Sequence, residues 1–269
     1  MLTDEWVRAI EGFVRNEKAG GKPRTTTDAR RQHLEHLARR VERGPWALTE
    51  DDLSNYASEQ EWANETRRGR RTTFVRFYSW GQAKGHVQSN PADALPKVKM
   101  SAGRARPAPD RVYHEAVIAA TPREQLMLRL AAEVGLRRTE VAIGHSRDLI
   151  EDLVGSSLIV HGKGGRERIV PLPASLGRAL AGLEPGYFFP GRDGGHLSPR
   201  YVGKLIATLM PDAWTMHTLR HRFATRAYAL RSDLLLVQEM LGHANPATTR
   251  RYVEYDRNRM RAVVEELAS

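Results

Sequence analysis

Apolar positions recur along the first hundred residues at intervals of three to four, the spacing that places one side of a helix against a core. Behind Thr3, whose hydroxyl is suited to cap a helix, the first such stripe consists of Trp6, Ile10, Phe13 and Val14. Similar patterns follow in residues 27–41, after Thr49 and in residues 64–85. The sequence therefore predicts four helices in this part of the chain.

Within these helices the pattern also predicts which side chains are buried. In residues 27–41 we expect Leu34, Leu37 and Val41 inside, and Arg30, Arg31, Arg39 and Arg40 outside. Asp52 stands three residues after Thr49, as in a capping box. The fourth helix supplies Phe74, Phe77, Tyr78 and Trp80 to the core and carries several arginines in its first turns.

The rest of the chain has a mixed pattern. Two β-rich runs, residues 157–161 and 166–172, flank Gly162-Lys163-Gly164-Gly165 and predict a hairpin. Helical spacing covers residues 125–134, 174–183, 198–209, 218–230 and 233–241, with Gly242 as a helix-terminating glycine. A last helix begins at Asn245-Pro246, and a terminal apolar stripe contains Met260, Val263, Val264 and Leu267. The predicted fold class is mainly α with a small β-sheet or hairpin.

A short segment separates the helical part of the chain from the mixed part. Residues 100–110 contain small residues, Arg104, Arg106 and two prolines, a composition that favours an extended linker over a helix. We therefore expect a helical domain in residues 1–99, a linker in residues 100–110 and a mixed α/β domain in residues 111–269.

Composition narrows the function classes. The 269 residues include 42 Lys+Arg and 32 Asp+Glu, a net charge of +10, so a polyanion is the first partner to consider. No cysteine is present, which excludes disulfides and thiol catalysis. No apolar run approaches the roughly 18 residues of a membrane helix, and the first residues lack a secretory signal pattern. We expect a cytoplasmic protein that does not bind membranes.

Several polar residues lie where the backbone restricts their motion. Arg137 follows a helix end, Lys163 lies at the hairpin tip, His217 and Arg220 share a face at a helix start, and His243 follows Gly242, with Tyr252 further on. Each alone is typical of an ordinary structural role. Together they suit phosphoryl transfer: arginines clamp a phosphodiester, lysine and histidine exchange protons, and tyrosine attacks phosphorus. Acidic residues are scattered, so we expect neither a metal nor a cofactor.

The order and the local strings of these residues resemble the tyrosine recombinase (phage integrase) family. The strings are Gly-Leu-Arg-x-x-Glu, Gly-Lys-Gly-Gly-x-Glu-Arg-x-Val-Pro-Leu, His-x-Leu-Arg-His, and Leu-Gly-His followed by Thr-Thr-x-x-Tyr. The resemblance covers residues 112–258. It implies a catalytic domain there, and the first hundred residues resemble the family's helical core-binding domain.

The resemblance assigns a role to each candidate. Arg137 and Arg220 would bind and polarise the scissile phosphate, and Lys163 would protonate the departing 5′ oxygen. His217 would act as acid and base, and His243 would donate to a non-bridging oxygen. Tyr252 would attack and leave a 3′-phosphotyrosyl link, with Tyr255 as a rival nucleophile. We interpret Glu140, close to Arg137, as structural.

Double-stranded DNA is the implied partner. Candidate contacts beyond the catalytic set are Arg30, Arg31, Arg67, Arg68, Arg70, Arg71, Arg104, Arg106, Ser198 and Arg200. Family members act as tetramers on two DNA sites through a Holliday junction, so we expect a homotetramer on DNA and a monomer in free solution. The stripe Met260–Leu267 would then pack on a neighbouring subunit, with the protein's own core as the alternative, and a directionality factor is a further partner.

The first predicted helix begins near residue 3, which leaves no room for the additional arm-binding domain that precedes this core in lambda-type integrases. The favoured interpretation is a compact phage integrase. The alternatives are a recombinase that resolves chromosome or plasmid dimers, a type IB topoisomerase, and a non-catalytic DNA-binding protein of the same fold.

Overall fold

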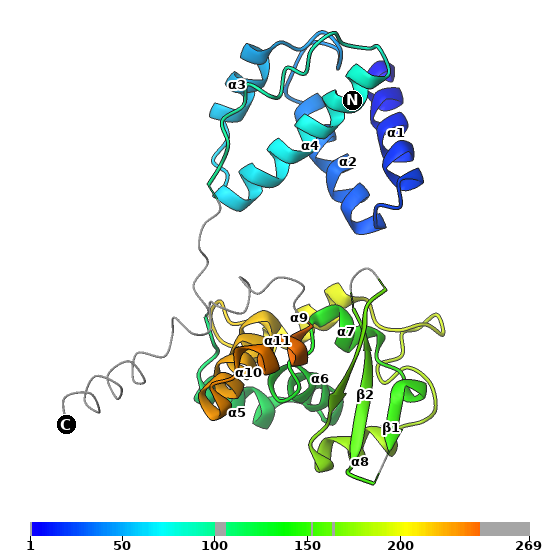
Figure 1. Cartoon of the computed structure of the whole chain (residues 1–269), viewed down its shortest axis with the longest axis vertical. Coiled ribbons are helices and arrows are strands. Elements are labelled where there is room, and N and C mark those ends of the chain that lie inside the picture. The colour runs from blue at the N-terminus through cyan, green and yellow to red at the C-terminus, as the bar shows by residue number, and fades with distance from the viewer. Residues whose placement is uncertain (1, 100–105, 152, 163–164, 243–269) are drawn as a thin grey trace, which may run out of the picture. The chain divides into compact units, whose positions relative to one another are not determined.

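A computed structural model describes residues 2–99, 106–151, 153–162 and 165–242. The chain divides into two compact units, Met1–Ala102 and Gly103–Ser269 (Figure 1). This division falls inside the predicted linker of residues 100–110, and the last linker position, Asp110, already begins a helix.

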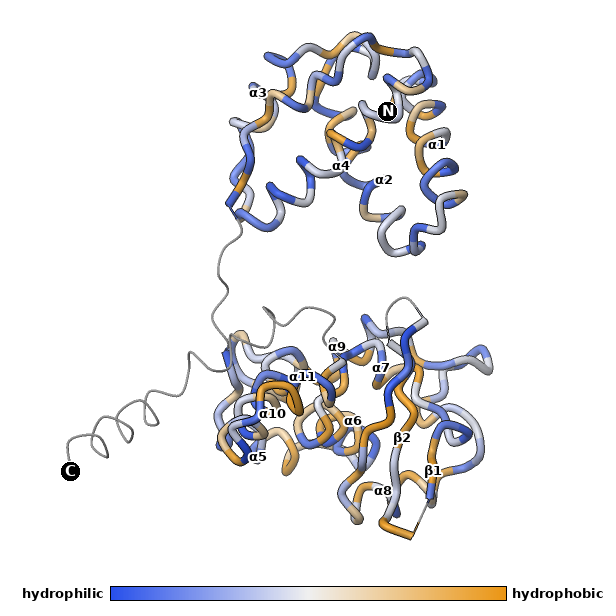
Figure 2. Tube along the Cα trace, viewed as in Figure 1, coloured by the Kyte–Doolittle hydropathy of each residue, from blue (hydrophilic) through white to orange (hydrophobic). Residues whose placement is uncertain are grey.

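The described part of the first unit consists of four helices, α1 (Asp4–Ala19), α2 (Arg24–Ala38), α3 (Glu50–Ser58) and α4 (Asn64–Ala83). Thr3 caps α1 through its hydroxyl, and Thr49 and Asp52 form the predicted capping box of α3. Figure 2 shows the alternation of apolar and polar positions along α1 that buries one side of this helix. The four predicted helices are therefore present.

Aromatic rings fill the core of this unit. Phe13 and Phe77 meet edge to face with ring centroids 5.5 Å apart, and Trp46 stacks on Phe77 at 5.1 Å. Such pairs add about 1 kcal/mol beyond the burial of their area. Because Phe77 lies on α4 and Phe13 on α1, these contacts fix the first helix against the fourth.

Helix α2 differs from the prediction in its bounds and in its burial, and it begins at Arg24 rather than at residue 27. It ends at Ala38, so Val41 lies beyond it and is only partly buried. Arg30 does not lie outside: its side chain is 12% exposed and is ion-paired with the buried carboxylate of Glu17 on α1. The helical spacing could not reveal that acidic partner on a different helix.

The second unit packs helices beside a small sheet. Its described elements are α5 (Asp110–Ala119), α6 (Pro122–Ala132), α7 (Arg138–Ile143), a 3-10 turn (Ser146–Asp148), β1 (Leu149–Glu151), β2 (Ser156–His161), β3 (Glu167–Pro171), α8 (Ala174–Ala181), α9 (Pro199–Leu209), α10 (Met216–Arg231) and α11 (Leu234–Leu241). The strands form an antiparallel sheet in the order β1-β2-β3. The predicted fold class, mainly α with a small β-sheet, is confirmed.

Three short elements, β1, α7 and α5, were not predicted from the sequence, each for a physical reason. Strand β1 spans only three residues, too few for an alternating pattern. Helix α7 spans six, and its first turn is held by the carboxylate of Glu140 rather than by an apolar stripe. Helix α5 follows directly on the proline-rich segment that we interpreted as linker.

The core of the second unit brings the later helices onto the earlier ones. Helix α10 packs along α6, and buried Met127, Leu128 and Leu219 belong to the same cluster. Helix α11 packs against α10 through Phe223, Val237 and Leu241. In this way residues about 80 to 100 positions apart in the chain lie side by side (Figure 1).

Gly135, which ends the turn after α6, is required by two separate constraints. Its φ of +75° lies in the left-handed region, and an added Cβ would lie 2.4 Å from the Phe223 ring. We predict that Gly135→Ala lowers the free energy of unfolding by about 2–4 kcal/mol, from backbone strain and overpacking together. Differential scanning calorimetry of the full chain measures this loss.

Gly194→Ala is the matched control, because Gly194 has a φ of +73° but open space where its Cβ would lie. It carries the backbone cost alone, about 1 kcal/mol. Equal losses in the two variants would show that the Phe223 ring does not constrain this turn.

Candidate active site

The buried carboxylate of Glu140 is the centre of the site. Its side chain is 2% exposed and lies in the first turn of α7. The backbone N–H of Arg137 donates to it at 2.8 Å and Nη1 of Arg137 at 2.7 Å. Arg168 binds both carboxylate oxygens, at 3.0 and 2.8 Å, and Nη1 of Arg220 lies 3.6 Å away. Glu140 thus contacts three arginines, from a helix start, a strand and α10.

The same three arginines bind the C-terminal end of α11. Nε of Arg168 donates to the carbonyl of Met240 at 2.9 Å, and Nη2 of Arg220 donates to that of Leu241 at 2.6 Å. Nη2 of Arg137 reaches the carbonyl of Gly242 at 3.2 Å. The free carbonyls of a helix end carry partial negative charge, so these contacts complement the helix dipole. Three consecutive carbonyls are therefore held by the arginines that surround Glu140.

The two predicted phosphate-binding arginines differ in exposure. Arg220 is 3% exposed, and its Nη1 also donates to the carbonyl of Gly135. Arg137 is 36% exposed and precedes α7. A buried guanidinium next to a partly exposed one suits an anion that approaches from solvent, because the first is preoriented while the second remains accessible.

The electrostatics of this cluster keep Glu140 ionised. Burial alone would raise the pKa of its carboxyl group, but the hydrogen bonds from Arg168 and from the Arg137 backbone outweigh burial and lower the pKa to about 2. Three guanidinium groups facing one carboxylate leave a formal excess of two positive charges at the site. That excess favours binding of an anion.

The two predicted residues at the start of α10 differ in exposure. Arg220 faces the protein interior, whereas His217 is exposed, with its ring centroid 4.1 Å from that of His221. Arg106 lies close by: its backbone N–H donates to Nδ1 of His221 at 3.0 Å, and its guanidinium covers the Trp214 ring at 4.3 Å. The start of the second unit therefore runs along the histidine side of α10.

The hairpin that carries Lys163 is present, although the lysine itself lies outside the described residues. Strands β2 and β3 pair antiparallel with His161 opposite Glu167, so the glycine-rich turn joins them as predicted. His161 is held between Asp148, 3.0 Å from its Nε2, and Glu167, 3.0 Å from its Nδ1. The hydrogen bond to Asp148, together with both negative charges, raises the pKa of His161.

Further predicted residues also fall outside the described part of the chain. They are Arg104, Asn245-Pro246, His243, Tyr252, Tyr255 and the stripe Met260–Leu267. For the residues from His243 onward, the structure defines where their segment starts, since Gly242 ends α11 in the left-handed conformation, with a φ of +61°.

Arg168 is the residue of this cluster to which sequence reasoning gave no role. Along β3 it shares the inward face with buried Val170, while Glu167 and Ile169 are exposed. A charged residue at an inward strand position signals a buried partner of opposite charge. That signal was available in the sequence, but the partner, Glu140, could not be identified from it.

The predicted DNA contacts of the first unit have partners within the protein. On α4, Arg67 donates to the carbonyls of Ala57 and Gln60, and Arg71 donates to that of Leu95. Their neighbours Arg68 and Arg70 contact Glu65 and the Trp62 ring, respectively. These arginines therefore brace the unit as well as adding to its positive charge.

Two predicted contacts lie at the start of α9. Ser198 caps this helix by accepting from the backbone N–H of Tyr201 at 3.1 Å, and Arg200 is exposed. A helix N-terminus with an arginine beside it is suited to a phosphate, but Ser198 also serves as an ordinary cap, and the predicted phosphate contact is untested. The prediction for Arg31, which is partly buried on α2, is likewise untested.

In the described ranges, no helix is long and apolar enough to cross a bilayer. No group of three His, Cys, Asp or Glu side chains converges there in a metal-binding arrangement.

The pKa of Glu140 leads to a prediction for stability. Because its pKa is lowered in the folded state, its stabilising contribution is present above the ordinary value of 4.5 and is lost as the pH falls towards 2. We predict that Glu140→Gln lowers the free energy of unfolding by about 3 kcal/mol at pH 7. Urea unfolding at several pH values should show this difference narrowing below pH 5.

Glu115→Gln is the control, since Glu115 forms an exposed ion pair with Arg111 on α5. Such i,i+4 pairs contribute less than about 0.5 kcal/mol. A loss in Glu140→Gln that is no larger than this, or that does not change with pH, would contradict the electrostatic account of the site.

Comparison with known proteins identifies the family of the chain. The model of the phage integrase family matches residues 110–259. The tyrosine recombinase XerC of Chromobacterium violaceum is 34% identical over 208 residues, 70% of this chain and 68% of the relative. That of Methylobacterium sp. (strain 4-46) is 38% identical over 152 residues, 51% of this chain but 45% of the relative. The match thus spans about half to two thirds of these relatives.

Solved structures share the fold. A lambda integrase (75-356) dimer bound to a COC′ core site has a TM-score of 0.74 at 18% identity, covering 91% of this chain and 96% of that chain. XerH site-specific recombinase bound to palindromic difH substrate, a post-cleavage complex, has a TM-score of 0.69 at 18% identity, with coverages of 97% and 95%. The family model, which matches more than half of the chain, and the Chromobacterium violaceum relative show that the chain belongs to the phage integrase family of tyrosine recombinases.

Proposed function

We propose that the chain is a site-specific DNA recombinase that cuts and rejoins strands through a 3′-phosphotyrosyl intermediate. The observation that carries this proposal is the arrangement of Arg137 and Arg220 on the buried Glu140 carboxylate. The pair is preoriented by the protein and leaves excess positive charge for a phosphodiester. Family membership supports the same chemistry.

In the proposed reaction, Arg137 and Arg220 bind the non-bridging oxygens of the scissile phosphate. These oxygens gain negative charge in the pentacoordinate transition state, so guanidinium groups fixed before the reaction stabilise it more than the ground state. His243 donates a further hydrogen bond to the same oxygens. Its segment begins directly after Gly242, whose carbonyl accepts from Arg137.

The oxygen of Tyr252 attacks phosphorus, and the bond to the 5′ oxygen breaks. His217 accepts the tyrosine proton, and Lys163, on the β2–β3 turn, donates a proton to the leaving oxygen. The phosphodiester is retained as a phosphotyrosyl ester, so attack by a 5′-hydroxyl reverses the step without an external energy source. This chemistry needs no metal or cofactor.

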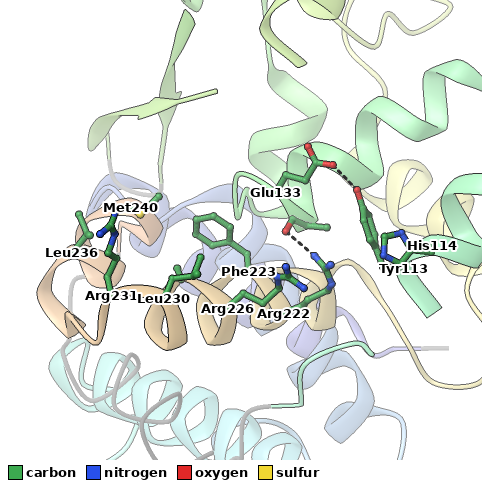
Figure 3. A pocket seen from close by; sticks show the side chains of 12 residues that line it. Tyr113, His114, Glu133, Arg222, Phe223, Arg226, Leu230, Arg231, Leu236 and Met240 are labelled. Carbon is green, nitrogen blue, oxygen red and sulfur yellow. Dashed lines mark hydrogen bonds between the residues drawn. The ribbon is translucent and has the colours of Figure 1, made fainter. Parts of the chain in front are cut away.

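The proposed assembly is a homotetramer on two DNA duplexes, exchanging strands through a Holliday junction. A cavity of about 540 Å³ supports it, lying among α5, α6, α10 and α11 in the second unit (Figure 3). Phe223, Leu230, Leu236 and Met240 give it apolar walls, and Arg226 and Arg231 add positive charge. The segment Met260–Leu267 of a neighbouring copy has an apolar stripe and carries two glutamates and one arginine, a net charge of −1, so it matches this apolar and basic lining.

DNA contacts outside the catalytic cluster are proposed at Arg31, Arg68, Arg70, Arg104, Arg106 and Arg200, with weaker contributions from Arg30, Arg67, Arg71 and Ser198, which have strong internal partners. Such contacts set affinity and salt dependence more than sequence choice. Integration of a phage genome, with a directionality factor as partner, is the proposed role. Resolution of chromosome or plasmid dimers is the alternative. The named relatives are tyrosine recombinases, and that description is compatible with both roles.

The nucleophile is tested with a DNA substrate nicked near the cleavage site. Cleavage then releases a short fragment that carries the free 5′-hydroxyl, and because this fragment diffuses away, the covalent intermediate cannot religate. We predict that the wild-type chain forms a protein–DNA adduct in the presence of EDTA. Tyr252→Phe, which removes only the attacking oxygen, should reduce the adduct by at least about 1,000-fold. Denaturing gel electrophoresis measures the adduct.

Tyr255→Phe is the matched control and should leave the adduct intact. Retention of the adduct in Tyr252→Phe with its loss in Tyr255→Phe would reassign the nucleophile. Absence of an adduct from the wild-type chain on its own recombination site would favour a non-catalytic DNA-binding role.

A further inference from the structure

Arg168 connects the catalytic arginines to the start of the C-terminal segment. It lies on the inward face of β3, 11% exposed, and binds both oxygens of Glu140 while its Nε donates to the carbonyl of Met240. Its planar guanidinium group thus donates hydrogen bonds to two elements, to Glu140 of α7 and to Met240 of α11. Arg137 donates to Glu140 through its Nη1, and Nη1 of Arg220 lies 3.6 Å from the carboxylate.

A second, steric observation places Arg168 against the turn that ends α11. A Cβ added to Gly242 would lie 3.0 Å from Cδ and 3.1 Å from Nη1 of Arg168. Gly242 also adopts a left-handed φ of +61°. The arginine therefore both holds the carbonyl of Met240 and limits the space beside Gly242, the last described residue before His243.

We propose that Arg168 is a positioning residue for DNA cleavage. By occupying both oxygens of Glu140, it fixes the carboxylate on which Arg137 and Arg220 are arranged, and by binding Met240 and packing against Gly242 it sets where the segment carrying His243 and Tyr252 begins. This inference rests on the proposed function. Arg168 acts through these residues and does not touch the DNA.

The geometry makes a lysine a poor substitute. A lysine ammonium keeps the positive charge, but it has no planar fork with which to bind two carboxylate oxygens and a carbonyl on another element at once. Arg168→Lys removes the planar guanidinium but keeps the charge, whereas Arg168→Ala removes both. Comparing the two variants therefore separates the effect of the charge from that of the hydrogen-bond geometry.

The test measures single-turnover adduct formation on the nicked substrate at saturating protein, together with the Kd for DNA. We expect Arg168→Ala to slow adduct formation by about 100-fold, the effect of misplacing a reacting group by roughly 1 Å. We expect Arg168→Lys to form the adduct at least about 10-fold more slowly than the wild-type chain, because lysine keeps the charge but lacks the planar guanidinium. The Kd for DNA should change less than about 3-fold in both variants, since Arg168 is a positioning residue rather than a phosphate contact.

A substrate with a methylphosphonate at the scissile position separates positioning from a general loss of structure. Its phosphorus carries no negative charge, so cleavage depends less on the alignment of Arg137 and Arg220. The defect of Arg168→Ala should therefore shrink by at least about 10-fold on this substrate relative to the phosphodiester. A misfolded fraction would reduce the rates on both substrates equally.

Arg129→Ala is the matched control, because Arg129 is a half-buried arginine that binds both oxygens of Glu133 within α6, away from Glu140 and α11. It should cleave both substrates at the wild-type rate. Wild-type rates in Arg168→Ala or in Arg168→Lys, or equal defects in Arg168→Ala and Arg129→Ala, would overturn the proposal. An inactive wild-type chain would instead refute the proposed function.

Discussion

The site depends on one buried charge. Glu140 is almost fully removed from solvent, and an isolated carboxylate there would cost several kcal/mol. Its neighbours have to supply the compensating charge, and three arginines do so from segments that are far apart in the sequence. The need to pair this carboxylate therefore brings the start of α7, strand β3 and helix α10 together, and the arrangement that satisfies Glu140 also leaves an excess of positive charge there.

The same arginines extend this constraint to α11. Because the carbonyls of Met240, Leu241 and Gly242 are each bound by a different arginine, the end of this helix cannot shift without breaking contacts to the carboxylate cluster. In the proposed mechanism the histidine and the nucleophile follow directly on that end. Stability and chemistry are therefore linked: the contacts that neutralise Glu140 also set the start of the reactive segment.

Much of this could be predicted from sequence, for physical reasons. Helices with an apolar stripe, such as α1 and α9, and the glycine-rich hairpin are encoded locally, and they were predicted with small errors at their ends. Elements held by distant charges were not: α7 depends on Glu140, and the burial of Arg30 depends on Glu17. The order of Arg137 and Arg220 indicated the chemistry, whereas the link through Arg168 requires knowledge of which strand lies against α7.

The central claim is that Glu140 and Arg168 act as a unit that positions Arg137 and Arg220, the arginines proposed to bind the scissile phosphate. A double-mutant cycle on the rate of covalent adduct formation, with Glu140→Gln and Arg168→Ala singly and together, tests it most directly. The account predicts that Glu140→Gln is much less harmful once Arg168 is absent, with a coupling free energy of about 1–3 kcal/mol. Additive effects of the two substitutions would contradict it.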